Sequence, residues 1–253
     1  MSNGYFTLLL ESSTMKTATN NAKPDQVTPM RSAAPAESSN IRWGNEIQSR
    51  DEQGGLKRFA ILRTAAELFN ERGFYETSLN ELAKRLNVTK PSLYHYIKNK
   101  DDILLQILNQ AVIEFQPAMN LAEESGLCGL EKLKIFVTQY TAAMTGVFGK
   151  CMVLSGLGPL EPSSRDELTP TFRLLDTFVR KLLDEGIQDG SITPCDTKIT
   201  TFSIFGAMHW LARWYRPDGE LSPQEIADRV FSLFDRGLRP VGGRDVCAAA
   251  PGR

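Results

Sequence analysis

Hydrophobic positions repeat with the period of a helix over most of residues 54–240. The first stripe consists of Phe59, Leu62, Ala66 and Phe69. Gly73 follows it at the place where a helix C-cap favours a left-handed residue. The chain shows no alternating pattern typical of strands, so the sequence predicts an all-α protein of about nine helices.

The second predicted helix begins at a capping box formed by Ser78 and Glu81. In such a box the hydroxyl accepts one unpaired backbone N–H and the carboxylate accepts another. The buried stripe of this helix consists of Leu79, Leu82, Ala83 and Leu86. Asn87 is expected to end the helix, because asparagine tolerates the left-handed backbone of a tight turn.

A short third helix is predicted from Lys90 to about Ile97, with Thr89 as its N-cap and Pro91 in its first turn. Leu93 and Ile97 share its buried face, which leaves the polar, aromatic and basic side chains exposed. Helix, three-residue turn and helix is the layout of a helix-turn-helix, whose second helix enters the major groove of DNA. On spacing alone, a small helical bundle with a solvated face remains the alternative.

The rest of the chain is also predicted to be helical. Asn99 is placed to cap a long helix, and Ser222 and Glu225 form a second capping box before the last one. Gly190 and Gly237 are expected to end two of these helices. The remaining stripes fall in residues 100–124, 130–148, 166–189, 197–215 and 223–237. The helix over 197–215 is apolar on more than one face, which indicates burial against two partners.

Charge is unevenly distributed along the chain. The overall net charge is −1, but residues 54–102 carry +3, whereas residues 1–53 carry −1 and residues 103–253 carry −3. The basic stretch therefore coincides with the helix-turn-helix pattern, as expected for a nucleic-acid module. Residues 1–53 are rich in small and polar residues without periodicity, and we predict a disordered extension there. Residues 241–253 are predicted to be a flexible tail.

Composition argues against several other classes of protein. Two histidines, His95 and His209, leave little room for a histidine-rich metal site. The four cysteines are far apart without a C-x-x-C, which argues against zinc-ribbon and thioredoxin-like sites and suits unpaired thiols in a reducing cytosol. The longest apolar stretch, Phe202–Ala212, is too short to span a bilayer. No catalytic or phosphate-loop motif is present, so no metal, cofactor or enzymatic activity is predicted.

The same residues resemble a known family. Ile61–Phe74 resembles the opening helix of the tetracycline-repressor (TetR) family, and Thr77–Ala83 resembles its second helix. Val88–Leu104 resembles the recognition helix and the start of the fourth helix. Asn87 stands where the family usually has a turn glycine, and Ile97 where it usually has phenylalanine; the geometry accepts both.

This resemblance implies DNA contacts at particular residues. Phosphate contacts are implied for Thr77, Thr89 and Lys100. Contacts with the groove or its walls are implied for Lys90, Pro91, Ser92, Tyr94, His95 and Tyr96. Hydroxyls and helix N-termini fix the register on phosphates, and exposed recognition-helix side chains read base edges. His95 is expected to face outward, although a lone histidine is more often structural; His209 is interpreted as a core or interface residue.

The resemblance also implies a homodimer and an effector. In the family the last two long helices pair with the same helices of a second subunit. The dimer then places its two reading helices on successive major-groove faces of a near-palindromic, double-stranded operator. Candidate effector-binding side chains are Met144, Phe148, Phe172, Phe205, Trp210, Arg213 and Trp214, each of which could instead be plain core. The Ala212–Gly219 segment resembles regulators of fatty-acid and sterol breakdown that respond to CoA thioesters, with Arg213 and Arg216 as candidate phosphate partners.

The sequence therefore predicts a cytoplasmic, dimeric repressor that a small molecule, such as an acyl-CoA, releases from DNA. Residues 54–102 would bind DNA, and residues 103–240 would bind the effector and form the dimer. The effector would shift the population toward dimers whose reading helices no longer fit the groove. The alternatives are an activator of the same fold, a ligand-binding or interaction module with a vestigial reading head, or a helical acyl-CoA-binding protein or enzyme.

Overall fold

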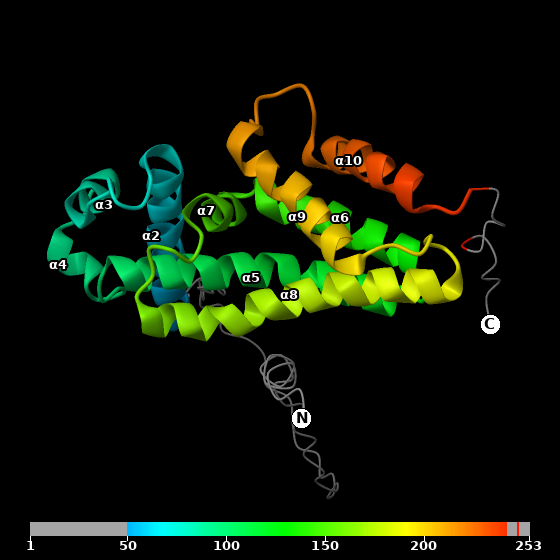
Figure 1. Cartoon of the computed structure of the whole chain (residues 1–253). Coiled ribbons are helices and arrows are strands. Elements are labelled where there is room, and N and C mark those ends of the chain that lie inside the picture. Colours follow the sequence, from blue (N-terminus) through cyan, green and yellow to red (C-terminus); the bar gives the residue numbers. More distant parts are fainter. Residues whose placement is uncertain (1–49, 242–246, 248–253) are drawn as a thin grey trace, which may run out of the picture. The chain divides into compact units, whose positions relative to one another are not determined.

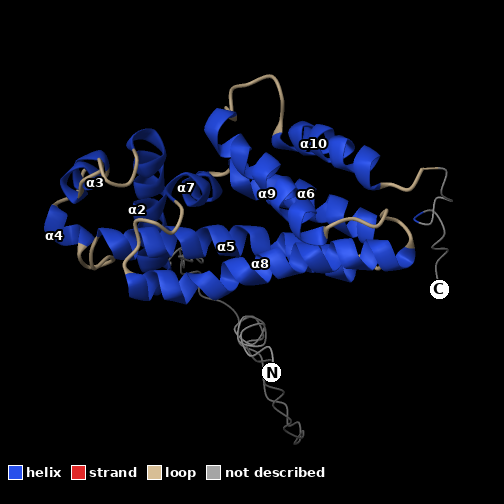
Figure 2. Cartoon of the chain, in the orientation of Figure 1, coloured by secondary structure: helices blue, strands red, loops and turns tan. Residues whose placement is uncertain are grey.

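The structure is a computed structural model that describes residues 50–241 and 247. Within those residues it contains nine helices and no strand (Figure 2), which confirms the predicted all-α fold. The predicted N-terminal extension and C-terminal tail lie almost entirely outside the described residues. None of the helices in the described residues has the length and apolar character needed to cross a membrane.

The helices follow one another through short connections. The first three are α2 (Arg50–Arg72), α3 (Leu79–Arg85) and α4 (Lys90–Leu93). The next three are α5 (Lys100–Glu124), α6 (Gly129–Thr145) and α7 (Val147–Ser155). The last three are α8 (Pro162–Asp189), α9 (Thr197–Trp214) and α10 (Pro223–Leu238). In Figure 1, α2, α3 and α4 group around the start of α5, and α8 runs alongside α5.

The ends of the first helices follow the predicted local chemistry. Gly73 ends α2 with a φ of 91°, and Asn87 adopts a φ of 53° in the turn before α4. Ser78 Oγ accepts the backbone N–H of Glu81 at 3.2 Å. The Glu81 carboxylate pairs with Arg72 and does not return to Ser78, so only half of the predicted capping box forms. The helix α2 begins at Arg50, earlier than the expected boundary.

The recognition helix is shorter than predicted. α4 ends at Leu93, because the N–H groups of Tyr94 and Tyr96 bond to carbonyls three residues back and tighten the chain into a turn. Leu93 and Ile97 are nevertheless both buried, as the pattern required. Asn99 then caps α5 by accepting the N–H of Asp102 at 2.7 Å, which confirms the predicted start of that helix.

Two other predicted helices differ from the structure. The stripe over 130–148 was expected to be one helix but breaks at Gly146 into α6 and α7. The chain turns so tightly there that a Cβ on Gly149 would lie 2.1 Å from the carbonyl oxygen of Ala143. Only glycine allows this approach. At the other end of the domain, α10 runs through Gly237 to Leu238 and so is not ended by that glycine.

The cysteines also differ from the expectation. Cys128 and Cys247, which are 119 residues apart in sequence, form a disulfide. Cys151 is a buried thiol and Cys195 a half-buried one. The prediction of unpaired cysteines was therefore wrong for one pair. The fold brings that pair together because α10 packs on α6 and Cys128 is the N-cap of α6.

Candidate DNA-reading surface and effector chamber

The reading surface is the exposed side of α4 and the turn after it. Lys90, Pro91, Tyr94 and His95 are exposed, and Leu93 on the opposite side is buried. Ser92 is half-buried, and its hydroxyl lies 2.8 Å from that of Thr89, the exposed N-cap residue. This part of the site therefore presents hydroxyls, a cation and two aromatic rings from one short element, as the sequence predicted for a groove reader.

Two of the candidate DNA contacts lie differently. Thr77 is buried, and its hydroxyl donates to the carbonyl oxygens of Gly73 at 2.9 Å and Leu68 at 3.4 Å. The Thr77 side chain therefore closes the end of α2 and is not part of the reading surface. Tyr96 is half-buried and lines a groove of about 450 Å³ between α4 and α2, together with Ile61.

Lys100 lies behind the reading surface. Its ammonium donates to the carbonyl oxygen of Tyr75 at 3.2 Å and lies 4.3 Å from the centre of the Phe74 ring. Burial lowers the pKa of Lys100, because the charged form loses part of its hydration. These contacts tie the start of α5 to the loop between α2 and α3, so Lys100 supports the reading surface from behind.

Two contacts join the reading domain to α7. The Asn70 amide of α2 donates to the carbonyl oxygen of Val147 at 2.9 Å. The rings of Phe59 and Phe148 meet edge to face at 5.5 Å. Because Phe148 also belongs to the buried cluster behind α7, a movement of α7 would reach α2 directly.

A further contact joins the start of α5 to α8. The Asp101 carboxylate accepts the backbone N–H of Glu161 at 2.7 Å and the hydroxyl of Ser164 at 2.6 Å. The N-terminus of a helix has unpaired N–H groups and a partial positive charge, and Asp101 lies at two such ends, those of α5 and α8. Asp101 therefore ties the start of α5, which follows the recognition segment in the chain, to the start of α8.

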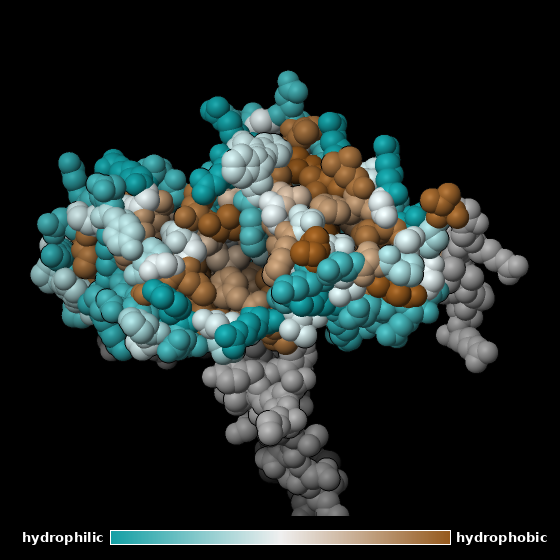
Figure 3. Space-filling model, in the orientation of Figure 1, coloured by the Kyte–Doolittle hydropathy of each residue, from teal (hydrophilic) through white to brown (hydrophobic). Residues whose placement is uncertain are grey.

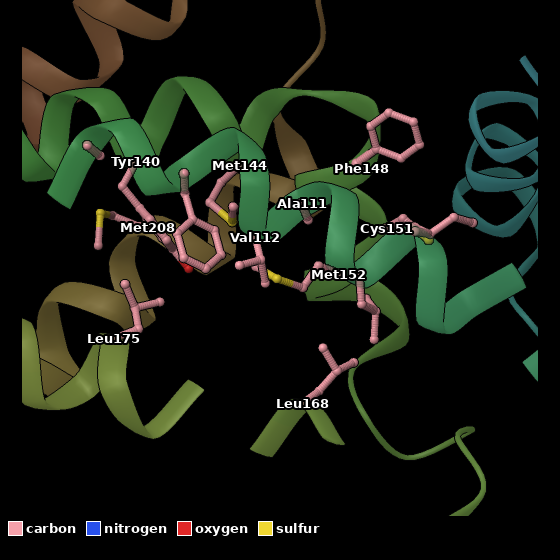
Figure 4. Close-up of a cluster of buried hydrophobic side chains, with 14 of the residues drawn as sticks. Ala111, Val112, Tyr140, Met144, Phe148, Cys151, Met152, Leu168, Leu175 and Met208 are labelled. Carbon is pink, nitrogen blue, oxygen red and sulfur yellow. The ribbon is translucent and has the colours of Figure 1, made fainter. Parts of the chain in front are cut away.

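The candidate effector site is the cluster of buried apolar side chains between α5, α6, α7, α8 and α9, which we call the chamber. Figure 4 shows buried side chains from these five helices, with Met144 in the middle of the group and the Phe148 ring at its edge, pointing away from the others. The other labelled members are Ala111, Val112, Tyr140, Cys151, Met152, Leu168, Leu175 and Met208. Figure 3 shows a hollow on one face, over α5 and between α7 and α8, with an apolar floor and hydrophilic residues along its edge. Flexible methionine side chains suit such a site, because they can repack around a guest molecule.

One polar pair lies among these apolar side chains. The Tyr140 hydroxyl lies 2.9 Å from Nε2 of His209, and the Phe205 ring packs against both residues. Burial raises the pKa of Tyr140 and lowers that of His209, because it disfavours the charged form of each. Tyr140 and His209 are thus both neutral near pH 7 and could present hydrogen-bonding atoms to a guest. This pair could not be predicted from the sequence, since its members are 69 positions apart.

The remaining candidate effector residues are divided between two places. Phe172 on α8 is half-buried against the core. Trp210, Arg213 and Trp214 lie on the outer side of α9, where Trp210 is 61% exposed, and so they do not belong to the chamber. The structure brings Met144, Phe148 and Phe205 to the chamber and leaves these three residues on the surface.

The outer side of α9 is an apolar face that stays exposed in the described part of the chain. Its exposed hydrophobic residues are Ile199, Phe202, Trp210 and Trp214. Gly206 lies in the same exposed row, and a Cβ there would meet nothing within 4 Å. Hydrophobic residues also gather over α9 and α10 in Figure 3. We call Ile199, Phe202, Gly206, Trp210 and Trp214 the α9 face.

Family models match both domains. The model for bacterial regulatory proteins of the tetR family matches residues 61–107, and the tetracyclin repressor-like C-terminal domain matches residues 127–238. A fatty acid metabolism regulator protein of Bacillus subtilis is 23% identical over 185 residues, covering 72% of this chain and 95% of its own length. The HTH-type transcriptional repressor KstR2 of Rhodococcus jostii is 28% identical over 188 residues, covering 72% and 91%.

Solved structures give the same result. AibR, crystallised in complex with isovaleryl coenzyme A and operator DNA, is 27% identical with a TM-score of 0.64, covering 70% of this chain and 97% of AibR. The regulator PfmR from Thermus thermophilus is 28% identical with a TM-score of 0.65. The two family models lie in succession and together match most of the described residues. This chain, with its helix-turn-helix domain and helical C-terminal domain, therefore belongs to the TetR family of transcriptional regulators.

Proposed function

We propose that this protein is a dimeric repressor that binds a near-palindromic operator and is released by an acyl-CoA thioester. The observation that carries DNA reading is the exposed side of α4, where Lys90, Tyr94 and His95 project from a helix anchored by Leu93. Within the described part of the chain the side chains of Lys90, Tyr94 and His95 make no hydrogen bond or ion pair, whereas a major groove offers partners for all three. A protein that acts on DNA in this way belongs in the cytoplasm and needs no catalytic activity.

The acyl-CoA assignment is supported by the chamber and by the relatives. The cluster is apolar and includes the buried methionines Met144, Met152 and Met208, and Figure 3 shows a hollow with an apolar floor on the surface over α5; an apolar site of this kind suits an acyl chain. AibR was crystallised with isovaleryl coenzyme A, and the relative named as a fatty acid metabolism regulator protein matches over 95% of its length. The Tyr140–His209 pair would offer the thioester carbonyl a hydrogen bond within the apolar wall.

The dimer is supported by the α9 face. One short reading helix makes too small a contact for high affinity, and two-fold pairing brings a second one to the next half-site. The exposed apolar residues of α9 and the open space at Gly206 allow a partner helix to approach closely. Removing such a face from water stabilises association by roughly 25 cal/mol per Å².

Release follows from the contacts between the domains. A guest between α5, α7 and α8 would move α7 against Phe59 and Asn70, and would move α8 against Asp101. The first shift would be passed to α2 and the second to the start of α5, and these two helices position α4. The operator affinity would then fall by the difference in effector binding between the two states, typically about 1–3 kcal/mol.

The test compares Lys90→Ala with Lys134→Ala, since Lys134 is an exposed lysine of α6 far from the reading surface in sequence and fold. Operator duplexes are first selected from a random pool with the full chain. Lys90→Ala should weaken binding and reduce the salt slope, whereas Lys134→Ala should leave both unchanged. Equal binding by both variants would refute this reading surface, and a pool without enrichment would refute sequence-specific binding.

A further inference from the structure

We propose that Cys128 and Cys247 are a reversible thiol–disulfide switch, oxidised by low-molecular-weight disulfides, that clamps the end of α10 to the start of α6. Cys128 is the N-cap of α6, and Cys247 follows α10 in the chain. Both residues are half-buried, so small thiols and disulfides can reach the sulfur atoms. The inference rests on the proposed function in one respect, namely that the protein works on DNA in a reducing compartment.

The corner around the disulfide is held together by other bonds as well. The Thr193 N–H donates to the carbonyl oxygen of Leu238 at 2.7 Å, and the Leu130 N–H donates to Ser191 Oγ at 3.1 Å. The loop between α8 and α9 thus bridges the start of α6 and the end of α10. The end of α10 would therefore stay beside the start of α6 after reduction, which limits how far Cys247, nine positions after Leu238, can move from Cys128.

Arg239 adds a direct link between the same two helix ends. Its guanidinium pairs with Asp235 at 2.9 Å and with Glu131, in the first turn of α6, at 3.8 Å. This partly exposed network is weak on its own. A covalent bond between Cys128 and Cys247 would add a constraint that persists when this network opens.

The other two cysteines contrast with this pair. Burial raises the pKa of the Cys151 thiol to about 12, so Cys151 is hardly ever the thiolate that disulfide exchange needs. Cys195 is half-buried and unbridged. In reducing compartments, disulfides of mesophilic proteins are usually transient and redox-sensing rather than structural.

The chemistry is an ordinary two-step exchange. The thiolate of one cysteine attacks a low-molecular-weight disulfide, forms a mixed disulfide and releases one small thiolate. The second cysteine thiolate attacks the protein sulfur of that mixed disulfide and releases the other. Two protein thiols are oxidised by two electrons, the small disulfide is reduced to two thiols, and the protons of the cysteines pass to the departing thiolates through water.

The clamp joins two elements that matter for the function. α6 carries Tyr140 and Met144 of the chamber, and α10 packs on α6 beside the α9 face. Closing a loop of more than 100 residues should raise the melting temperature by about 10 °C. The oxidised dimer should also dissociate several-fold less readily, because the disulfide restricts local opening of α10 from α6.

The test equilibrates the full chain in a series of reduced and oxidised glutathione mixtures. Alkylation and mass spectrometry count the thiols, thermal melting reports the clamp, and analytical ultracentrifugation reports dimer dissociation. We expect two thiols to disappear together as the melting temperature rises and the dimer tightens. Cys247→Ser should stay at the reduced melting temperature in every mixture, and the matched control Cys195→Ser should behave as the unmodified chain.

Either of two results would overturn the switch. One is four free thiols in the most oxidising mixture, and the other is a disulfide that changes neither the melting temperature nor dimer dissociation. Because thiol counts and melting involve neither DNA nor effector, these results would leave the proposed repressor function intact. Conversely, a working switch in a protein that binds no operator would refute only the proposed function.

Discussion

Asp101 offers the sharpest test of how the two domains communicate. Replacing it by alanine removes the acceptor for the Glu161 N–H and for the hydroxyl of Ser164, a residue only 9% exposed. Hydrogen bonds to charged groups contribute about 1.5–3 kcal/mol each when buried, and water can replace part of this at a half-buried carboxylate. We therefore expect Asp101→Ala to lower the stability by about 2–3 kcal/mol, or about 4–12 °C in melting temperature.

The functional effect should be more specific than the loss of stability. With α8 released from the start of α5, effector binding would still reshape the chamber but would reach α4 through one fewer contact. The ratio of operator affinities without and with effector should shrink several-fold, while effector affinity changes little. Fluorescence anisotropy on an operator duplex, with and without isovaleryl coenzyme A, measures this ratio below the melting range of the variant.

Asp166→Ala is the matched control for this measurement. Asp166 is an exposed aspartate of α8, and no hydrogen bond or ion pair holds it within the described part of the chain. It should melt and respond to effector as the unmodified protein does. If Asp101→Ala also kept the melting temperature and the effector response of the unmodified protein, the proposed link through α8 would be refuted.

Three further predictions concern separate parts of the molecule. Gly206→Trp fills open space on a single chain, so ultracentrifugation should find a folded monomer; a dimer of normal strength would contradict the α9 face. Thr77→Val should cost about 1 kcal/mol in chemical denaturation yet leave the salt slope of operator binding unchanged, because the Thr77 hydroxyl is used inside the domain. Burial lowers the pKa of His209, so the unfolded chain binds more protons below about pH 6.5 and stability should fall as the pH drops through that range. His209→Gln should remove this part of the pH profile and His95→Gln should keep it; the reverse result would refute the assignment.

Local features of the fold were predictable from the sequence. The caps at Ser78, Asn99 and Ser222 and the left-handed turn residues Gly73 and Asn87 all depend on neighbours within about four positions. The exposed side of α4 followed from the positions of two buried residues. The break between α6 and α7 escaped prediction, because the apolar stripe continues through it and only the close backbone approach shows the need for glycine.

The contacts that join distant segments could not be predicted. Asp101 and Ser164, Tyr140 and His209, and Cys128 and Cys247 are each more than 60 positions apart, and single residues of these types occur throughout the chain. Thr77 is a different case. Family resemblance implied a phosphate contact, but burial decides the role of a hydroxyl, and burial follows from the packing of α2 on α3 and not from residue type.

The most direct test of the account is operator binding by the full chain on DNA flanking its own gene, measured by anisotropy across a salt series with and without acyl-CoA esters. If each protomer neutralises about three phosphates, the slope of log K against log salt should be roughly −5, and one CoA thioester should release the DNA. Binding that is tight but unaffected by any thioester would contradict the effector assignment. Binding no tighter than to unrelated duplexes, both here and after selection from random sequences, would contradict the repressor itself.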